Sequence, residues 1–431
     1  MATRHSSAGS STVSLVRGLG LLAAIAIVVA DVIGTGVFLK ARVMTCNVGT
    51  PAMVVTVWVV GGLLSLAGAL TYAELAVLMP RAGGEYVFIR EAYGRLWGFL
   101  YGWTRFFVAS TGGLAGLAAG FAIFLNIASG GALQAHALTV PLGARGISIG
   151  AVTLVASGAI LLVTLVNCAA VSVGGRIASV LATLKVSLVL GVGVGAFILA
   201  DGNWTHYALS AVGGACEGVP AAARGGIAGF GAAMLGAMWA YNGWNEVTYV
   251  AGEVKDPSRN LPRAIIGGIG IIATLYVFAN VAYFYVLTPA AVASISPASA
   301  VATEVVARFL GPAAGGLMAA ALAMSVFGSL LVVALVSARI PYAMAADGLF
   351  FSALGRLSPR TRVPIRALWA QAFWSIVLVF SGSYDTITDY AIFAVLIFVA
   401  LATASVFVFR RRKTNTEAVA RTTKIRTAKI A

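Results

Sequence analysis

The chain has 431 residues, of which 60% are hydrophobic and only 10% are charged, and its formal net charge is +15. A soluble domain has roughly 25% charged residues, and a chain this apolar could not cover its folded surface with polar groups. The composition therefore excludes a soluble enzyme and indicates an integral membrane protein. The positive charges lie in short segments between apolar runs rather than on one soluble face, so they do not indicate a nucleic-acid partner.

Ten apolar runs approach or exceed the length of about 20 residues that a helix needs to cross a bilayer. We predict membrane spans at 18–44, 51–79, 96–127, 147–168, 176–200, 226–251, 264–288, 313–346, 366–382 and 386–409. The first run contains no small-x-small cleavage site, so we interpret it as a retained helix rather than a signal peptide. The sequence thus predicts an all-α polytopic membrane protein with ten transmembrane helices.

The distribution of Lys and Arg between these spans predicts the orientation. With the N-terminus inside, 21 of the 29 Lys and Arg residues fall on the cytoplasmic side and five fall outside. Cytoplasmic loops are enriched in these residues. We therefore expect a multi-pass protein of the cytoplasmic (inner) membrane, with the N-terminal tail 1–17 and the basic tail 410–431 both in the cytoplasm.

Two spans are interrupted by glycine and polar residues. The first is broken at 33–38, and the sixth at 239–246. Spans one and six hold the same position in two groups of five, which we expect to form five-helix units at 18–200 and 226–409. Broken helices at corresponding positions of two halves indicate a transport site near the middle of the membrane.

The two breaks favour a zwitterionic ligand. The half-helix that begins near Gly36 offers free N–H groups and the positive end of a helix dipole, which suit a carboxylate. The half-helix that ends near Ala240 offers free C=O groups, which suit an ammonium group. An α-amino acid carries both. The alternative is that these glycines only permit kinks and close helix packing.

Several short motifs then support one family. They are Ile33-Gly34-Thr35-Gly36-Val37-Phe38, Tyr72-Ala73-Glu74-Leu75, Pro80-Arg81-Ala82-Gly83-Gly84-Glu85-Tyr86, Ala240-Tyr241-Asn242-Gly243-Trp244-Asn245, Glu253-Val254-Lys255-Asp256-Pro257, Arg259-Asn260-Leu261-Pro262, Ala338-Arg339, Tyr342-Ala343-Met344-Ala345 and Asp347-Gly348. In this order, over about residues 15–412, the chain resembles the amino acid–polyamine–organocation superfamily, and most closely its L-type amino acid transporter branch.

The resemblance implies a five-plus-five inverted-repeat fold with alternating access and no chemical conversion of the substrate, hence not an enzyme. It places the substrate against Val32, Ile33, Gly34, Thr35, Gly36, Trp239, Ala240, Tyr241 and Asn245. In this interpretation the glycine-rich turn receives the carboxylate, and the carbonyls of residues 32, 33, 239 and 240 receive the amino group. The Trp239 ring would gate the outer side of the site, and Asn245 would support the unwound segment.

Charged residues inside the spans suggest how transport is coupled. The resemblance places Lys185 where sodium-coupled relatives bind a cation, with Ser325 and Ser329 facing it. A fixed ammonium group there would replace Na⁺ and favour exchange or H⁺ coupling. The alternative is a structural lysine that only holds span one to span five.

Asp31 and Glu246 remain open. Asp31 would pair with Lys185, titrate during transport, attract a cationic substrate, or only cap the unwound turn. Glu246 lies in the broken sixth span, where it would influence substrate charge. We expect Arg105, like other charges near helix ends, to be paired or to snorkel to the inner surface.

The sequence predicts no cofactor, no metal and no obligatory protein partner. Its cysteines and histidines lack metal-ligand spacing, and Cys46, Cys168 and Cys216 fit no position for a linkage to another chain. Most relatives have twelve spans, so helices 11 and 12 are expected to be absent, and a truncated gene product remains an alternative.

The leading hypothesis is a secondary transporter for small or neutral amino acids. The first alternative keeps the fold but moves cationic amino acids or polyamines. The second is a truncated, non-transporting sensor or scaffold.

Overall fold

The computed structural model describes residues 19–79, 84–134, 137–142, 145–169, 175–358, 361 and 363–428. Several predicted features lie outside this part of the chain. They are the tail 1–17, residues 80–83 of the motif at 80–86, the loop at 170–174 and the last residues, 429–431.

Each of the ten predicted spans coincides with a helix or helix pair. They are α1 (Leu21–Val32) with α2 (Gly36–Val48), α3 (Pro51–Leu78), α5 (Arg95–Thr104) with η1 (Arg105–Ala109) and α6 (Ser110–Ala128), α7 (Ala151–Ala169), α8 (Gly175–Leu199), α9 (Gly226–Tyr241) with η5 (Glu246–Glu253), α10 (Pro257–Val286), α13 (Pro312–Ser337) with α14 (Arg339–Ala346), α15 (Ile365–Val379) and α16 (Tyr384–Ala428). Among the described residues, seven are long and apolar enough to cross a membrane, and the α1–α2 pair, bent by 44°, gives an eighth. The helices α9 and α15 are shorter.

Shorter elements connect the long helices. They are α4 (Gly84–Tyr93), η2 (Ala132–Gln134), β1 (Ala137–Leu142), β2 (Arg145–Gly150), η3 (Trp204–Ala208), η4 (Ala221–Ala223), α11 (Pro289–Ala293), α12 (Val301–Leu310) and η6 (Ser352–Gly355).

One short hairpin, formed by β1 and β2, interrupts the otherwise helical fold that the sequence predicted. These strands form an antiparallel hairpin in which Ala137 pairs with Gly150, so the fourth span begins at Ala151 rather than at 147. Thr139 and Val140 on one strand, and Ile147 and Ile149 on the other, are β-branched residues that favour paired strands. The apolar run was therefore partly strand.

The helix of the tenth predicted span extends beyond its apolar part. The helix α16 continues without interruption from Tyr384 to Ala428, past the basic residues at 410–413. Lys, Arg, Ala and Glu are good helix formers, so the polar composition of this segment ended the apolar run but not the helix.

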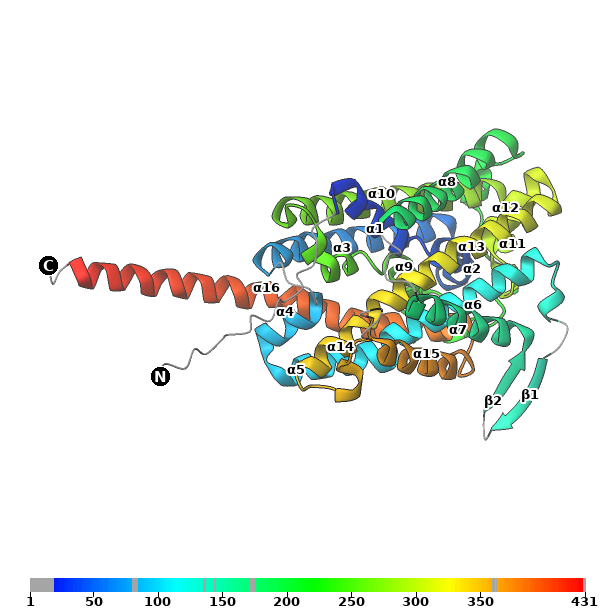
Figure 1. The fold of residues 1–431 in the computed structure, drawn as a ribbon. Helices are drawn as coiled ribbons and strands as arrows, with labels where there is room; N and C mark the ends of the chain where they lie inside the picture. Colours follow the sequence, from blue (N-terminus) through cyan, green and yellow to red (C-terminus); the bar gives the residue numbers. More distant parts are fainter. Residues whose placement is uncertain are drawn as a thin grey trace.

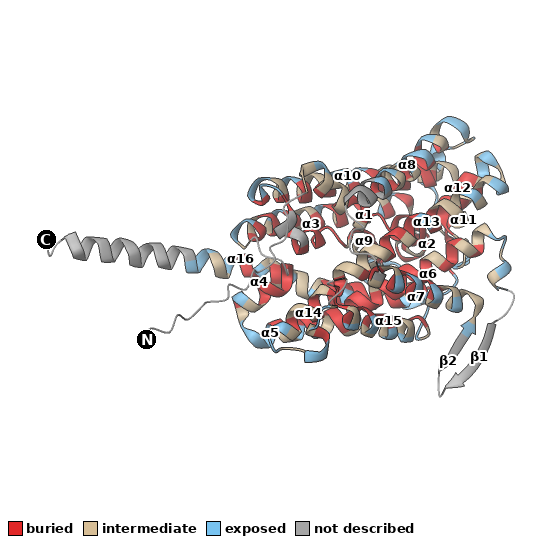
Figure 2. Cartoon of the chain, in the orientation of Figure 1, coloured by how far each residue is buried: buried red, intermediate tan, exposed pale blue. Residues whose placement is uncertain are grey.

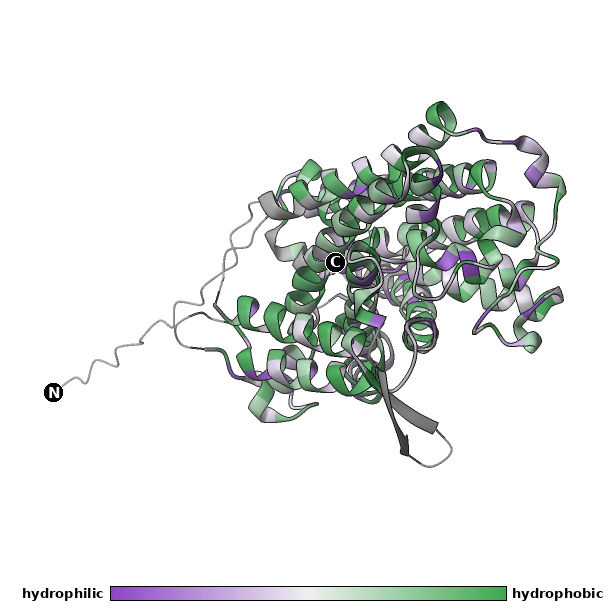
Figure 3. Cartoon of the chain, turned by 90° about the vertical axis from the view of Figure 1, so that its right-hand side faces the viewer, coloured by the Kyte–Doolittle hydropathy of each residue, from purple (hydrophilic) through white to green (hydrophobic). Residues whose placement is uncertain are grey.

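Burial concentrates in the middle of the helix bundle (Figure 2). The α5–α6 span is 72% buried over its most apolar window, whereas the α16 span is only 28% buried, which makes α6 a central helix and α16 a peripheral one. Hydrophobic residues predominate along the helices of the bundle (Figure 3), and many of them are exposed on its outside. Large exposed side chains there include Leu22, Leu63, Leu154, Ile198, Leu317 and Phe407. Such surfaces suit contact with lipid.

The bundle has two distinct ends (Figure 1). The helices α4, α5 and α14 gather at one, which we call the α4 end, and α11, α12 and the β-hairpin gather at the other, the hairpin end. A disulfide joins Cys46 of α2 to Cys216, 170 residues away, and the sequence analysis did not predict it. Both cysteines lie in segments predicted to be outside, where disulfides persist.

Candidate functional site

The first break separates α1 from α2 at residues 33–35. The amide of Gly34 bonds back to Val32 O at 2.8 Å, and the helical pattern resumes when Leu39 N bonds Thr35 O at 3.1 Å. The first N–H groups of α2 consequently have no carbonyl one turn earlier to receive them. The α2 helix therefore presents these free donors, and the positive end of its dipole, to the centre of the bundle.

The second break lies beside the first. The helix α9 ends at Tyr241, and residues 242–245 form a turn before η5. A Cβ atom on Gly36 would lie 2.4 Å from Ala240 Cβ, so the start of α2 meets the end of α9 in a contact that only glycine permits.

A tyrosine on α10 ties the two breaks together. Its hydroxyl, on Tyr276, lies 3.1 Å from Val32 O and 2.9 Å from Ala240 O. The hydroxyl has one proton to donate, so it satisfies one of these carbonyls fully and shares the other. Each carbonyl keeps a second lone pair for a further donor.

A cavity opens at the junction of the breaks. Its lining comprises Asp31, Val32, Gly34, Thr35, Gly36, Arg105, Ala109, Ser110, Gly113, Leu117, Trp239, Asn242, Gly243, Glu246 and Val333. The lining combines backbone of the first break, the small-residue face of α6, and charged groups toward the α4 end.

Toward the hairpin end, aromatic and hydroxyl groups close the cavity. Tyr384 donates to Thr35 Oγ1 at 2.8 Å. The indole of Trp239 lies 3.1 Å from the Tyr384 hydroxyl and 3.3 Å from Thr35 Oγ1. Trp239 is 8% exposed, so this triad separates the cavity from the space beyond it.

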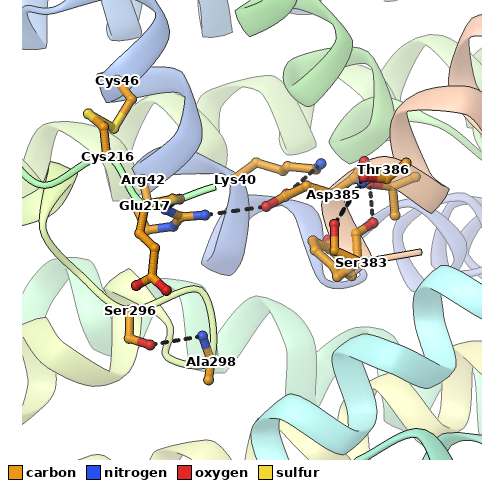
Figure 4. A network of polar contacts seen from close by, with 12 residues as sticks. Lys40, Arg42, Cys46, Cys216, Glu217, Ser296, Ala298, Ser383, Asp385 and Thr386 are labelled. Atoms are coloured by element: carbon orange, nitrogen blue, oxygen red, sulfur yellow. Dashed lines mark hydrogen bonds and ion pairs between the residues drawn. A yellow bond between two sulfur atoms is a disulfide. The ribbon is translucent and has the colours of Figure 1, made fainter. Parts of the chain in front are cut away.

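An ion cluster forms the next layer (Figure 4). Lys40 Nζ lies 2.8 Å from Asp385 and 3.0 Å from Asp389, and Arg42 lies 3.3 Å from Asp385. Arg42 also donates to the carbonyl of Glu217 at 2.8 Å, next to the disulfide. The two cations of α2 are thereby held to the start of α16 while both are almost fully buried.

Toward the α4 end, Glu85 organises a polar core. Its two oxygens accept from Tyr72 at 2.5 Å, Asn245 at 2.8 Å, Tyr101 at 2.7 Å and Tyr249 at 3.3 Å. Four donors from three other parts of the chain thus replace the lost hydration of a carboxylate that is only 1% exposed.

Arg105 connects this core to the cavity. It belongs to the π-helical turn η1, a type of distortion that often occurs at functional sites. Its Nη2 donates to Glu246 at 3.0 Å and to the Tyr249 hydroxyl at 3.1 Å. The guanidinium therefore bridges the cavity and the Glu85 core.

A surface network at the same end holds α4 to the end of α14. Tyr86 donates to Asp347 at 2.7 Å, and Arg90 pairs with the same carboxylate. Burial, together with this hydrogen bond, raises the pKa of Tyr86 to about 12. Tyr86 therefore keeps its proton, and its bond to Asp347, at neutral pH.

The remaining predicted residues lie behind the cavity. Lys185 of α8 is 1% exposed and donates to Ala30 O and to Ser329 of α13. Ser325 is buried one turn earlier on α13. Lys185 thus links α8 to α1 and α13, next to the first break.

The structure brings together only part of the predicted set. Asp31, Val32, Gly34, Thr35, Gly36 and Trp239 line the cavity, whereas Ile33, Ala240, Tyr241, Asn245, Lys185, Ser325 and Ser329 do not. Tyr241 instead donates to Trp58 O at 3.0 Å, and Asn245 donates to Glu85. No Asp31–Lys185 ion pair is found in the described part of the chain.

Sequence reasoning missed four residues of this region. Tyr276 and Tyr384 lie in or at the start of apolar runs, and a lone tyrosine there gives no signal. Arg105 and Glu85 did carry a signal in the sequence, since a charge in or beside an apolar run usually marks a pair or a site. The pairing of Arg105 with Glu246 at 3.0 Å is one of the two outcomes that the sequence predicted for it.

Two broken helices around a polar cavity, inside a bundle of apolar helices, define a membrane transporter. A sequence profile of the amino acid permease family matches residues 19–428, and the chain belongs to that family. It is therefore an amino acid transporter and not an enzyme.

Individual relatives match over nearly the whole chain. Identity is 28% to the serine/threonine exchanger SteT of Bacillus subtilis (strain 168), covering 92% of this chain and 84% of that protein. It is 30% to the large neutral amino acids transporter small subunit 2 of Oryctolagus cuniculus, covering 95% and 72%. It is 28% to the b(0,+)-type amino acid transporter 1 of Mus musculus, covering 94% and 78%.

The Gly36–Ala240 contact gives the first prediction. Gly36→Val should reduce amino acid transport in proteoliposomes by roughly tenfold or more, because overpacking costs about 1–3 kcal/mol. Gly158→Val is the matched control, since a Cβ at Gly158 meets nothing within 4 Å. Equal transport by both variants would contradict the close approach of the two half-helices.

The ion cluster gives the second prediction. Lys40→Gln removes the cation that Asp385 and Asp389 share and leaves only Arg42 beside Asp385, which weakens the link between α2 and α16. In a Cys168→Ser background, Ser110→Cys places a thiol in the cavity. This thiol should react roughly tenfold faster with a membrane-impermeant reagent added outside when Lys40 is replaced by Gln than when Lys40 is retained. Lys255→Gln, an exposed lysine, is the control, and an unchanged rate would show that the cluster does not close the cavity.

Proposed function

We propose that this protein is a secondary active transporter of small or neutral amino acids, working by alternating access in the cytoplasmic membrane. The observation that carries the proposal is the cavity at the junction of two helix breaks, where the N-terminus of α2 and the C-terminus of α9 meet. The amides of Gly34, Thr35 and Gly36 would receive the substrate carboxylate. The carbonyls near Val32 and Ala240 would receive its amino group through lone pairs that Tyr276 leaves free.

The two groups of five helices, 18–200 and 226–409, would be the units that move relative to each other. Trp239, Thr35 and Tyr384 would be the first barrier on the outer side, with the Lys40 cluster behind it. The hairpin end would face the outside, in keeping with the disulfide there, and both termini would be cytoplasmic.

Lys185 would set the coupling. A buried ammonium group held by Ala30 O and Ser329 occupies the space between α1, α8 and α13, so it would supply the positive charge that Na⁺ supplies elsewhere. Exchange or H⁺ coupling would follow, rather than Na⁺ coupling. The Bacillus subtilis relative is a serine/threonine exchanger, which supports this mode.

A second candidate is transport of cationic amino acids or polyamines by the same fold. The carboxyl groups of Asp31 and Glu246 in the cavity lining favour it.

The third prediction tests this function directly. Purified protein in proteoliposomes should take up labelled small neutral amino acids when unlabelled amino acid is inside, or when the outside is acidic. A Na⁺ gradient should have no effect. Lys185→Ala should abolish uptake, because it removes the ammonium group that holds α1, whereas the exposed Lys255→Ala should not.

Two results would contradict the proposal. Uptake driven by Na⁺ would refute the role of Lys185. Selective uptake of lysine, arginine or polyamines would replace the neutral substrate class with the second candidate.

A further inference from the structure

Two carboxyl groups from different helices converge at the α4 end of the cavity. Asp31 lies in the last turn of α1, and Glu246 is the first residue of η5. Both side chains line the same cavity, together with Arg105. The backbone at Gly243 passes close to the Asp31 side chain, since a Cβ atom on Gly243 would lie 3.1 Å from Asp31 Oδ2.

No donor of the protein satisfies this pair fully. Glu246 Oε1 accepts from Arg105, but its buried Oε2 has no hydrogen-bond partner in the described structure. Asp31 accepts no hydrogen bond from an N–H or O–H donor among the described residues. Two carboxylates that share one small cavity disfavour each other's ionised form, so the site favours the binding of one proton.

The surrounding charges leave room for one proton. Arg105 from η1 and Lys185 from α8 are the cations near the pair, and Glu85 from α4 is the third carboxylate. Among the described residues, α10 contributes the Tyr276 hydroxyl beside Val32 O and Ala240 O, and α13 contributes Val333 to the cavity lining. Three carboxylates against two cations leave one net negative charge, which is costly inside a membrane and which one bound proton removes.

The site also favours a proton over a substrate cation. Arg105 already pairs with Glu246 at 3.0 Å, so an ammonium or guanidinium group of a substrate would have to displace it, whereas a proton would not. Asp31 is partly exposed to the cavity, whereas Lys185 is sealed behind it, so a proton on the pair can exchange with the cavity when either end opens.

We propose that Asp31 and Glu246 form a proton-carrying carboxyl pair, positioned by Arg105, which couples transport of a neutral amino acid to the entry of one proton. The inference rests on the proposed function and deepens it. One H⁺ binds to the pair when the cavity faces outside and leaves when it faces the cytoplasm. One zwitterion and one positive charge cross together, while Lys185 stays hydrogen-bonded to Ala30 O and Ser329.

The fourth prediction is a measurement of proton and amino acid movement in the same proteoliposomes. Added neutral amino acid should acidify the lumen, as reported by a trapped pH dye, and an inside-negative potential should increase uptake. Asp31→Asn and Glu246→Gln should lower the ratio of pH-driven uptake to counterflow uptake by roughly tenfold, a change equivalent to about 1.4 kcal/mol. Asp201→Asn, an exposed aspartate, should keep the wild-type ratio.

The outcomes separate this inference from the proposed function. Wild-type counterflow without acidification or response to potential would overturn the proton pair and leave amino acid transport standing. Absence of uptake under every driving force would overturn the proposed function itself. Arginine or lysine uptake that is lost in Asp31→Asn, with no proton movement, would assign the pair to a substrate cation instead.

A second measurement does not require active variants. Infrared difference spectra of the wild-type protein in bilayers should contain the C=O band of a protonated carboxyl group that disappears on raising the pH. The band should be missing in Asp31→Asn and present in Asp201→Asn. Its absence from the wild-type protein would overturn the proposal even if the variants fail to transport.

Discussion

The structure depends on backbone groups that cannot be left unpaired inside a membrane. A continuous helix satisfies its own N–H and C=O groups, but both broken spans give up part of that pairing. Here the loss is confined to one place, because the end of α1, the start of α2 and the end of α9 meet at a single cavity. The same unsatisfied groups are what a zwitterion can bind, so the structural cost and the function have one origin.

The surrounding helices are arranged to make that junction possible. Tyr276 binds a carbonyl on each side of it, Gly36 admits Ala240, and Gly120 of α6 admits the Thr35 side chain, which a Cβ would meet at 2.3 Å. The two ends differ in chemistry. Aromatic rings and an ion cluster close the hairpin end, whereas Arg105, Asp31 and Glu246 place charge at the α4 end.

Much of this was predictable because the governing signals are local. Span length, the two glycine-containing breaks and the buried charge of Lys185 are each visible within a few residues. The unpredicted parts depend on which distant segments meet. The Cys46–Cys216 bond spans 170 residues, and Tyr276 carries no local sign that its hydroxyl serves two breaks. The β-hairpin was missed because β-branched apolar residues suit a short strand as well as a membrane helix.

The most direct test of the central claim is a distance measurement by solid-state NMR on the protein in bilayers. An amino acid labelled with ¹³C at its carboxylate is bound to the protein, and only the amides of glycines that follow a threonine are observed. In this sequence these glycines are Gly36 and Gly112. The account predicts ¹³C–¹⁵N coupling that corresponds to about 4 Å, as for a carboxylate hydrogen-bonded to the amide of Gly36. Saturable binding without that coupling would contradict it.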